Sequence, residues 1–208
     1  GQNGADKTTT IKMLCCLLTP TSGDAELLVD SILTSPAAVK QKINESPQET
    51  AVAPNLSVWE NLELIARIYG HDKARAVEKA TEMMRALNLE DRAKDRGKTL
   101  SGGLQRRLSI AMALISEPEI IFLDEPTLGL DVRARRDLWK VLMALKGKIT
   151  IVLTTHYLEE AEALSDRIAI MHEGRLQALG TLEALKEQTE QDSLEEIFLS
   201  LTETEVFA

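Results

Sequence analysis

The fold is decided by residues 100–126, which open with Leu-Ser-Gly-Gly-Leu-Gln (100–105) and close with Ile-Ile-Phe-Leu-Asp-Glu-Pro (120–126). The apolar part of the second stretch has the length of a buried strand, and two carboxylates, Asp124 and Glu125, end it. Uncompensated carboxylates at the end of a buried strand are costly. The two carboxylates would be explained if Asp124 binds Mg²⁺ and Glu125 contacts an attacking water. Taken alone, such a pair is more often a strand end with a helix cap.

Strand-like and helix-like segments alternate on both sides of this stretch, which predicts an α/β fold with a parallel sheet. A turn-rich cluster at 19–24 ends the first helix, and Glu173-Gly174 marks a hairpin turn. The predicted helices cover 8–18, 58–87, 104–116, 131–145, 158–164 and 194–201, and the predicted strands cover 24–29, 120–123, 149–154 and a hairpin over 167–179.

The first nine residues, Gly-Gln-Asn-Gly-Ala-Asp-Lys-Thr-Thr, nearly form a phosphate-binding loop. In such a loop, backbone N–H groups and a helix N-terminus surround phosphate oxygens. Lys7 would contact the outer phosphates and Thr8 would coordinate Mg²⁺. The pattern requires glycine where Asp6 stands, so this segment by itself fits a phosphate loop and an ordinary glycine-rich turn equally well.

The composition predicts an ordinary globular protein, with 208 residues that are 44% hydrophobic and 27% charged. The apolar runs are strand-length, so we expect no membrane-spanning segment, and with no leader visible we expect cytosolic residence. Cys15 and Cys16 are neighbours on a helix, which suits neither a disulfide nor a metal site. The net charge of −9, with an acidic tail, argues against a nucleic-acid-binding face.

Five motifs in order identify the chain as resembling ABC-transporter ATPase domains. They are the phosphate loop, the glutamine loop around Gln48, the signature loop with Ser101, Gly102 and Gly103, the strand ending in Asp124 and Glu125 with the D-loop 127–131, and the switch histidine His156. The resemblance implies a P-loop NTPase-type, mainly parallel α/β sheet in one domain over 1–208. It also implies a helical insertion over roughly 54–116 and an acidic tail over roughly 183–208. The opening strands and the adenine-stacking aromatic residue are expected to be truncated from the start.

The resemblance implies ATP and Mg²⁺ as cofactors and assigns a role to each matching residue. Glu125 polarises the attacking water, His156 contacts the γ-phosphate, and Gln48 senses the metal and γ-phosphate. Thr8, Gln48 and Asp124 organise Mg²⁺, and Asp131 links the two sites of a dimer. The nucleotide would be held by Asn3, Gly4, Ala5, Lys7, Thr8 and Thr9 of one chain and by Ser101, Gly102 and Gly103 of its partner. On its own, His156 would more often be a satisfied polar residue.

The same resemblance implies a second ATPase subunit, homomeric or heteromeric, and a transmembrane permease, which would place the chain on the cytoplasmic face of the membrane. The sequences at 55–62 and 193–198 resemble those of the family branch that serves drug, ion and polysaccharide or lipid exporters. We expect no nucleic-acid partner, because the chain has one cassette, a negative charge and no basic arm.

Asp6 departs from the family pattern and predicts weak ATP binding at this chain's own phosphate loop. Its carboxylate would lie about 5 Å from the β-phosphate, where one like-charge pair costs about 3 kcal/mol at an effective dielectric of about 20, before screening. The motifs taken together still predict an energy-coupling ATPase. The alternative is a degenerate, non-hydrolysing cassette that acts as a regulatory or binding partner of an intact ATPase. Glu125 and His156 weigh against that alternative.

Overall fold

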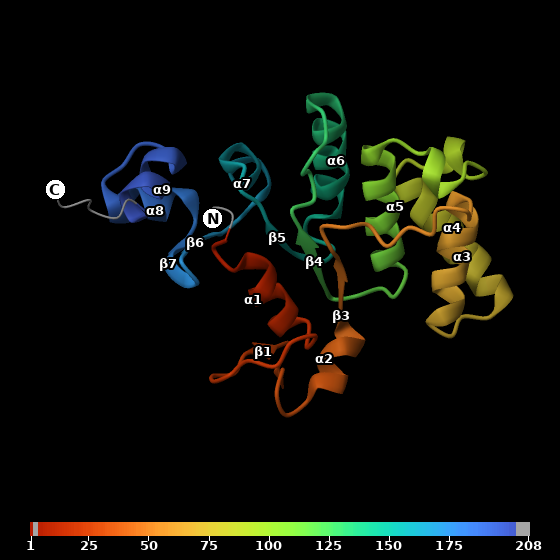
Figure 1. Ribbon diagram of the computed structural model, residues 1–208, viewed down its shortest axis with the longest axis horizontal. Coiled ribbons are helices and arrows are strands. Elements are labelled where there is room, and N and C mark those ends of the chain that lie inside the picture. The colour runs from red at the N-terminus through yellow and green to blue at the C-terminus, as the bar shows by residue number, and fades with distance from the viewer. Residues whose placement is uncertain (2–3, 203–208) are drawn as a thin grey trace. The chain divides into compact units, whose positions relative to one another are not determined.

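The computed structural model describes residue 1 and residues 4–202, which fall into two compact units. The larger unit runs from Ile11 to Leu153, and the smaller unit combines Gly1–Thr10 with Thr154–Ala208. Figure 1 labels the elements. Among the described residues, no helix combines the length and the apolar character needed to cross a membrane.

The larger unit contains the sheet and most of the helices. Helix α1 and strand β5 each extend across a unit boundary and are included here. In chain order the elements are α1 (Lys7–Leu14), β1 (Glu26–Leu27), β2 (Asp30–Ser31), α2 (Pro36–Lys42), β3 (Ile43–Ser46), α3 (Val58–Ile68), α4 (Lys73–Ala86), the short 3₁₀ turns Glu90–Arg92 and Gly97–Thr99, α5 (Gly102–Leu114), β4 (Ile120–Asp124), α6 (Val132–Leu145) and β5 (Thr150–Thr154).

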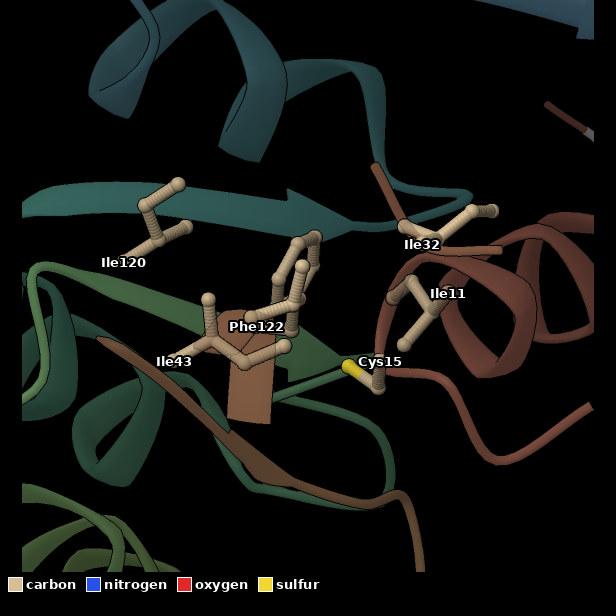
Figure 2. Close-up of a cluster of buried hydrophobic side chains, with 7 residues drawn as sticks. Ile11, Cys15, Ile32, Ile43, Ile120 and Phe122 are labelled. Carbon is tan, nitrogen blue, oxygen red and sulfur yellow. The ribbon is translucent and has the colours of Figure 1, made fainter. Parts of the chain in front are cut away.

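The core of the larger unit lies on β4, whose five residues are all buried. The sheet order is β3-β4-β5, and β3 runs parallel to β4 with Ser46 opposite Leu123. Figure 2 shows how Ile11 of α1 and Cys15, the residue after that helix, pack against Ile43 of β3 and Phe122 of β4. A central strand covered on both faces is expected to read as a continuous apolar run, as this one does.

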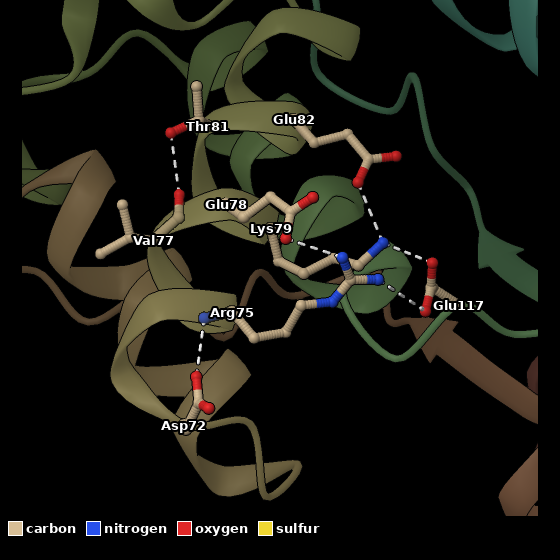
Figure 3. Close-up of polar contacts among 8 residues, drawn as sticks. All are labelled: Asp72, Arg75, Val77, Glu78, Lys79, Thr81, Glu82 and Glu117. Carbon is tan, nitrogen blue, oxygen red and sulfur yellow. Dashed lines mark hydrogen bonds and ion pairs between the residues drawn. The ribbon is translucent and has the colours of Figure 1, made fainter.

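Helices α3, α4 and α5 pack on one another within the larger unit (Figure 1). Helix α3 begins at Ser57, whose side chain forms a capping box with Glu60. The buried side chain of Lys79 on α4 is 2% exposed and forms ion pairs with Glu82, at 2.9 Å, and with Glu117, which precedes β4 (Figure 3). This contact fastens α4 to the loop that enters the central strand.

The smaller unit contains an antiparallel hairpin and the helices that follow it. After α7 (Leu158–Leu164), strands β6 (Ile168–His172) and β7 (Arg175–Gly180) are followed by α8 (Leu182–Thr189) and α9 (Leu194–Thr202). The predicted hairpin is confirmed. Leu185, Leu194 and Ile197 bury their side chains against Ile170 of β6, so the part of the predicted acidic tail that contains them packs within this unit.

Several predicted element boundaries were wrong. The helical region predicted over 58–87 consists of two helices, because the chain turns at Gly70, whose φ is +86°. The strand predicted over 24–29 is instead the pair of short strands β1 and β2. Helix α1 ends at Leu14 and not at Leu18, and α2 and β3 were not predicted at all.

Candidate active site

The end of β4 carries the two carboxylates that the sequence singled out. Asp124 is 4% exposed and Glu125 is 6% exposed. Glu125 has a φ of +47°, in the left-handed region that side chains other than glycine seldom adopt. A conformation of this kind costs about 1–3 kcal/mol and persists only where the surrounding structure holds it. The strain at Glu125 therefore marks the end of β4 as a candidate functional position.

An arginine on α5 hydrogen-bonds to the backbone at this end of β4. The Arg106 side chain is 5% exposed, and its guanidinium donates hydrogen bonds to five backbone carbonyls. We call this arrangement the Arg106 clasp, and its acceptors are the carbonyl oxygens of Pro47, Gln48, Asp124, Glu125 and Pro126. The clasp joins the segment that follows β3 to the segment that ends β4.

Gln48 comes into this site because β3 lies beside β4. Ser46, the last residue of β3, shares a 2.8 Å hydrogen bond between hydroxyl groups with Ser109 of α5, and both side chains are buried. Two residues later the side chain of Gln48 is exposed, while its carbonyl accepts from Arg106 at 3.2 Å. The Nη2 atom of Arg106 thus donates hydrogen bonds to the carbonyls of both Gln48 and Glu125.

The signature loop forms the N-terminus of α5. Ser101 caps this helix by accepting a hydrogen bond from the Leu104 amide, and Gly102 and Gly103 are its first two residues. A Cβ atom at Gly103 would lie 3.0 Å from the Cβ atom of Ala134, so glycine permits a close approach to α6. Asp131 caps α6 through the amide of Ala134 at 2.9 Å. The signature loop and the D-loop aspartate therefore open two adjacent helices.

The phosphate loop lies in the smaller unit. Gly4 and Asp6 both have a positive φ, +81° and +60°, and the following turn begins α1 with Lys7, Thr8 and Thr9. The Lys7 ammonium donates to the carbonyl of Gly1 at 2.8 Å. Ala5 is buried, and Asn3 lies outside the described residues.

His156 also belongs to the smaller unit and is close in space to the start of the phosphate loop. The amino group of Gly1 donates to the carbonyl of Thr155 at 3.4 Å. The His156 ring lies on that of Tyr157, with centroids 4.1 Å apart. The structure therefore places the phosphate loop and His156 in one unit, and Gln48, Ser101, Asp124, Glu125 and Asp131 in the other.

Arg106 is the site residue that sequence reasoning missed. The signal was present, because Arg106 precedes Ile110 and Ala113 by four and seven residues and so shares their buried helix face. A charged side chain on a buried face is rare unless it is well hydrogen-bonded.

The available metal ligands suit a hard cation that is also bound by a substrate. The described residues contain no group of three or more His, Cys, Asp or Glu side chains that could hold a metal ion. Mg²⁺ in phosphoryl-transfer sites takes one or two protein oxygens together with phosphate oxygens and water. Within the larger unit, the Asp124 carboxylate and the Gln48 amide are oxygen ligands of this type.

Comparisons with known proteins point to one family. A family model described as ABC transporter matches residues 1–128. The chain is 44% identical over 188 residues to the daunorubicin/doxorubicin resistance ATP-binding protein DrrA of Streptomyces peucetius, covering 89% of the chain and 57% of DrrA. It is 41% identical to the human phospholipid-transporting ATPase ABCA3, covering 90% of the chain and 11% of ABCA3. The chain thus spans only part of each relative.

Solved structures show the same likeness in three dimensions. An ATP-binding subunit of an ABC transporter superposes with a TM-score of 0.83 at 32% identity, covering 98% of this chain and 86% of that subunit. A dimeric post-hydrolysis state of the ATP-binding cassette MJ0796, bound to ADP and Pi, superposes with a TM-score of 0.77 at 27% identity, covering 88% of this chain and 83% of the cassette. The P-loop NTPase-type α/β fold expected from the motifs is confirmed.

Proposed function

The chain belongs to the ABC transporter family, and from this membership we propose that it is an ATP-binding subunit that couples ATP binding and hydrolysis to transport through a separate membrane permease. The observation that carries the proposal is the end of β4. There, two buried carboxylates, one on strained backbone, share the Arg106 clasp with the Gln48 segment. A purely structural strand end gives no reason to maintain both the buried charge and the strain.

The proposed roles follow the motif of each residue. Glu125 orients and polarises the attacking water, and His156 contacts the γ-phosphate. Asp124, Gln48 and Thr8 hold Mg²⁺, which when bound supplies charge stabilisation for the transferring phosphoryl group. The phosphate loop of residues 3–9 binds the nucleotide of its own chain, and Asp131 connects the two sites of a dimer.

The residues fit a magnesium nucleotide with one exception. Positive φ angles at Gly4 and Asp6 and the helix that starts at Lys7 are features of a loop that wraps a phosphate. Asp6, however, places a carboxylate at the same helix N-terminus. We therefore propose that this loop binds ATP weakly.

We propose that the chain works as a head-to-tail dimer on the cytoplasmic face of a membrane. Ser101, Gly102 and Gly103 would then complete the nucleotide site of the partner subunit, a role that does not involve Asp6. The relatives named for drug resistance and for phospholipid transport support a drug or a phospholipid as the transported substrate.

The proposal is tested by replacing Glu125 with glutamine, in the native chain and in an Asp6→Gly background. We expect kcat for MgATP hydrolysis to fall by about 10²-fold or more, with the KM for ATP changed by less than about threefold, because the carboxylate acts in the transition state. The matched control is Glu119→Gln, which removes an exposed carboxylate just before β4. The proposal fails if neither the native nor the Asp6→Gly chain hydrolyses ATP.

A second candidate function is favoured by Asp6 alone. A chain whose own phosphate loop binds ATP weakly would act as a regulatory partner that lends its signature loop to an intact ATPase. Calorimetry with MgATP separates the two functions, since a regulatory partner would show no binding until Asp6 is replaced.

A further inference from the structure

The Arg106 clasp joins segments that are far apart in the sequence. From the middle of α5, the guanidinium reaches Pro126 through Nε, Pro47 through Nη1, and the carbonyls of Gln48, Asp124 and Glu125 through Nη2. The four distances to atoms other than the Pro47 carbonyl lie between 3.0 and 3.2 Å. All of these residues belong to the larger unit, which also contains Gln48 and Glu125.

Only a guanidinium can satisfy this set of acceptors. It offers five N–H donors in a flat fork, whereas lysine offers three donors from a single point and glutamine offers two. The acceptors nearest to it are buried, so carbonyls that lost their donor would lose a hydrogen bond without gaining water. The turn after β4 and the segment after β3 would then each be free to adopt another backbone conformation.

The clasp binds the backbone on both sides of the Glu125 Cα, where the backbone conformation sets the direction of the Glu125 side chain. Arg106 donates to the carbonyls of Asp124 and Glu125, which belong to the two peptide groups that flank the Glu125 Cα, and Glu125 is the residue with a φ of +47°. If these carbonyls were released, the strained φ could relax, and that rotation would redirect the Glu125 carboxylate. The same donor also fixes the carbonyl of Gln48.

We propose that Arg106 is a positioning residue that sets the placement of Glu125 relative to Gln48 for ATP hydrolysis. The inference rests on the proposed ATPase function, because it assigns a role in that same site. The hydrogen bonds that carry this role go to the main chain of the residues that Arg106 positions.

The test uses three variants of the full chain, studied with and without Asp6→Gly. Arg106→Gln removes the fork, Arg106→Lys keeps the charge without the fork, and Arg107→Gln is the matched control. Arg107 neighbours the clasp on α5 but pairs with Asp137 of α6 instead, at 3.7 Å. Thermal unfolding identifies any variant that does not fold.

The first measurement is amide hydrogen exchange, which needs no catalysis. We expect Arg106→Gln and Arg106→Lys to speed exchange by about tenfold or more in both 48–50 and 125–130, while the α9 amides and the Arg107→Gln control stay unchanged. Acceleration in only one of the two segments, or equal acceleration in the control, overturns the clasp.

The second measurement is the split between kcat and KM. Misplacing a catalytic group by about 1 Å costs about 10²-fold in rate, so we expect Arg106→Lys to lower kcat by about 10- to 100-fold with little change in the KM for ATP. A lysine variant with native kcat overturns the positioning role. If the parent chain hydrolyses no ATP, the proposed function fails, and hydrogen exchange still decides whether the clasp exists.

Discussion

At the scale of single residues, Asp6 combines a backbone conformation that aspartate tolerates with a charge that, we propose, disfavours a bound phosphate. Asp6 adopts a φ of +60°, which glycine reaches most easily and which aspartate and asparagine reach more readily than most residues. Its carbonyl accepts from the Thr10 amide at 3.0 Å in the first turn of α1, and its carboxylate lies at the N-terminal end of that helix. A helix N-terminus favours an anion, so the Asp6 carboxylate would compete with a phosphate for this position.

Replacing Asp6 with glycine is expected to strengthen MgATP binding by about 10- to 100-fold. The lower figure allows for the solvent exposure of Asp6, which screens the repulsion. Asp6→Asn is the matched control, since it keeps the size and the tolerance for positive φ but removes the charge. Calorimetry should find tighter binding for both variants. If only glycine restores binding, backbone or steric strain is the cause, and if neither does, the charge argument is wrong.

The sequence was sufficient to find residues that belong to a motif but not residues that support one. Asp6, Asp124 and Glu125 stand out because each occupies a defined place in a known spacing. The left-handed backbone of Glu125 could not be predicted, because it depends on the turn after β4. Arg106 was missed because its five acceptors are main-chain atoms from distant segments, and no side-chain pattern announces them.

At the scale of elements, the contact between α4 and the loop before β4 depends on a buried ammonium group. Burial acts to lower the pKa of Lys79, but hydrogen bonds from Lys79 to Glu117 and Glu82 outweigh it and raise that pKa above its usual value. The hydrogen bond with Lys79 lowers the pKa of Glu117 in turn. Figure 3 shows both carboxylates directed at the Lys79 ammonium.

Glu117→Gln is expected to lower the free energy of unfolding by about 1 kcal/mol near neutral pH, a figure reduced for the exposure of Glu117. The pKa of Glu117 is lowered from 4.5, so its contribution is full above pH 4.5 and is lost as the pH falls through the folded-state pKa. The pKa of Lys79 is raised from 10.5, so its contribution is lost as the pH rises above that value.

Urea unfolding across this pH range measures the effect. The difference between native and variant should be largest between these two limits and should shrink in acid. Glu78→Gln is the control, because Glu78 pairs with Arg75 and not with Lys79. A difference that does not vary between pH 3 and pH 7 would exclude the ion pair as its cause.

The elements predicted correctly are those with a strong local pattern. The apolar run of β4 and the Glu173-Gly174 turn between β6 and β7 needed no distant information. Strand β3, Ile-Asn-Glu-Ser, has only one apolar residue, and it is a strand because it pairs with β4. Its Asn44 side chain donates to the Ala113 carbonyl and to the Ser116 hydroxyl, both at 3.0 Å, which compensates for its polarity.

At the scale of the whole molecule, the functional motifs are divided between the two units. The phosphate loop and His156 lie in the smaller unit, while the signature loop and the β4 carboxylates lie in the larger one. The order of motifs along the chain was predictable from sequence, but this division was not, because it depends on residues 1–10 folding together with the segment after Leu153.

A mixing experiment tests the head-to-tail dimer. On the proposed function, native chains have an intact signature loop and a phosphate loop that binds ATP weakly. Chains with Asp6→Gly and Ser101→Arg have a phosphate loop that binds ATP more tightly and a disrupted signature loop. A mixed dimer would contain one complete site, built from the phosphate loop of the double variant and the signature loop of the native chain. We expect co-expressed mixtures to hydrolyse ATP about tenfold faster than either chain alone.

The control mixture pairs the double variant with a native chain that also carries Ser101→Arg, and it should stay inactive. Activity equal to the average of the two separate chains would contradict head-to-tail pairing.

The acceptors of the Arg106 clasp have a consequence for how such a chain can evolve. Every amino acid, proline included, carries the carbonyl oxygen that Arg106 requires, so the side chains at 47, 48 and 126 can change without removing a single acceptor. The sequence requirement of these five hydrogen bonds therefore lies at position 106. A search for pairs of positions that change together would overlook these five contacts, because none of the acceptors depends on a particular side chain.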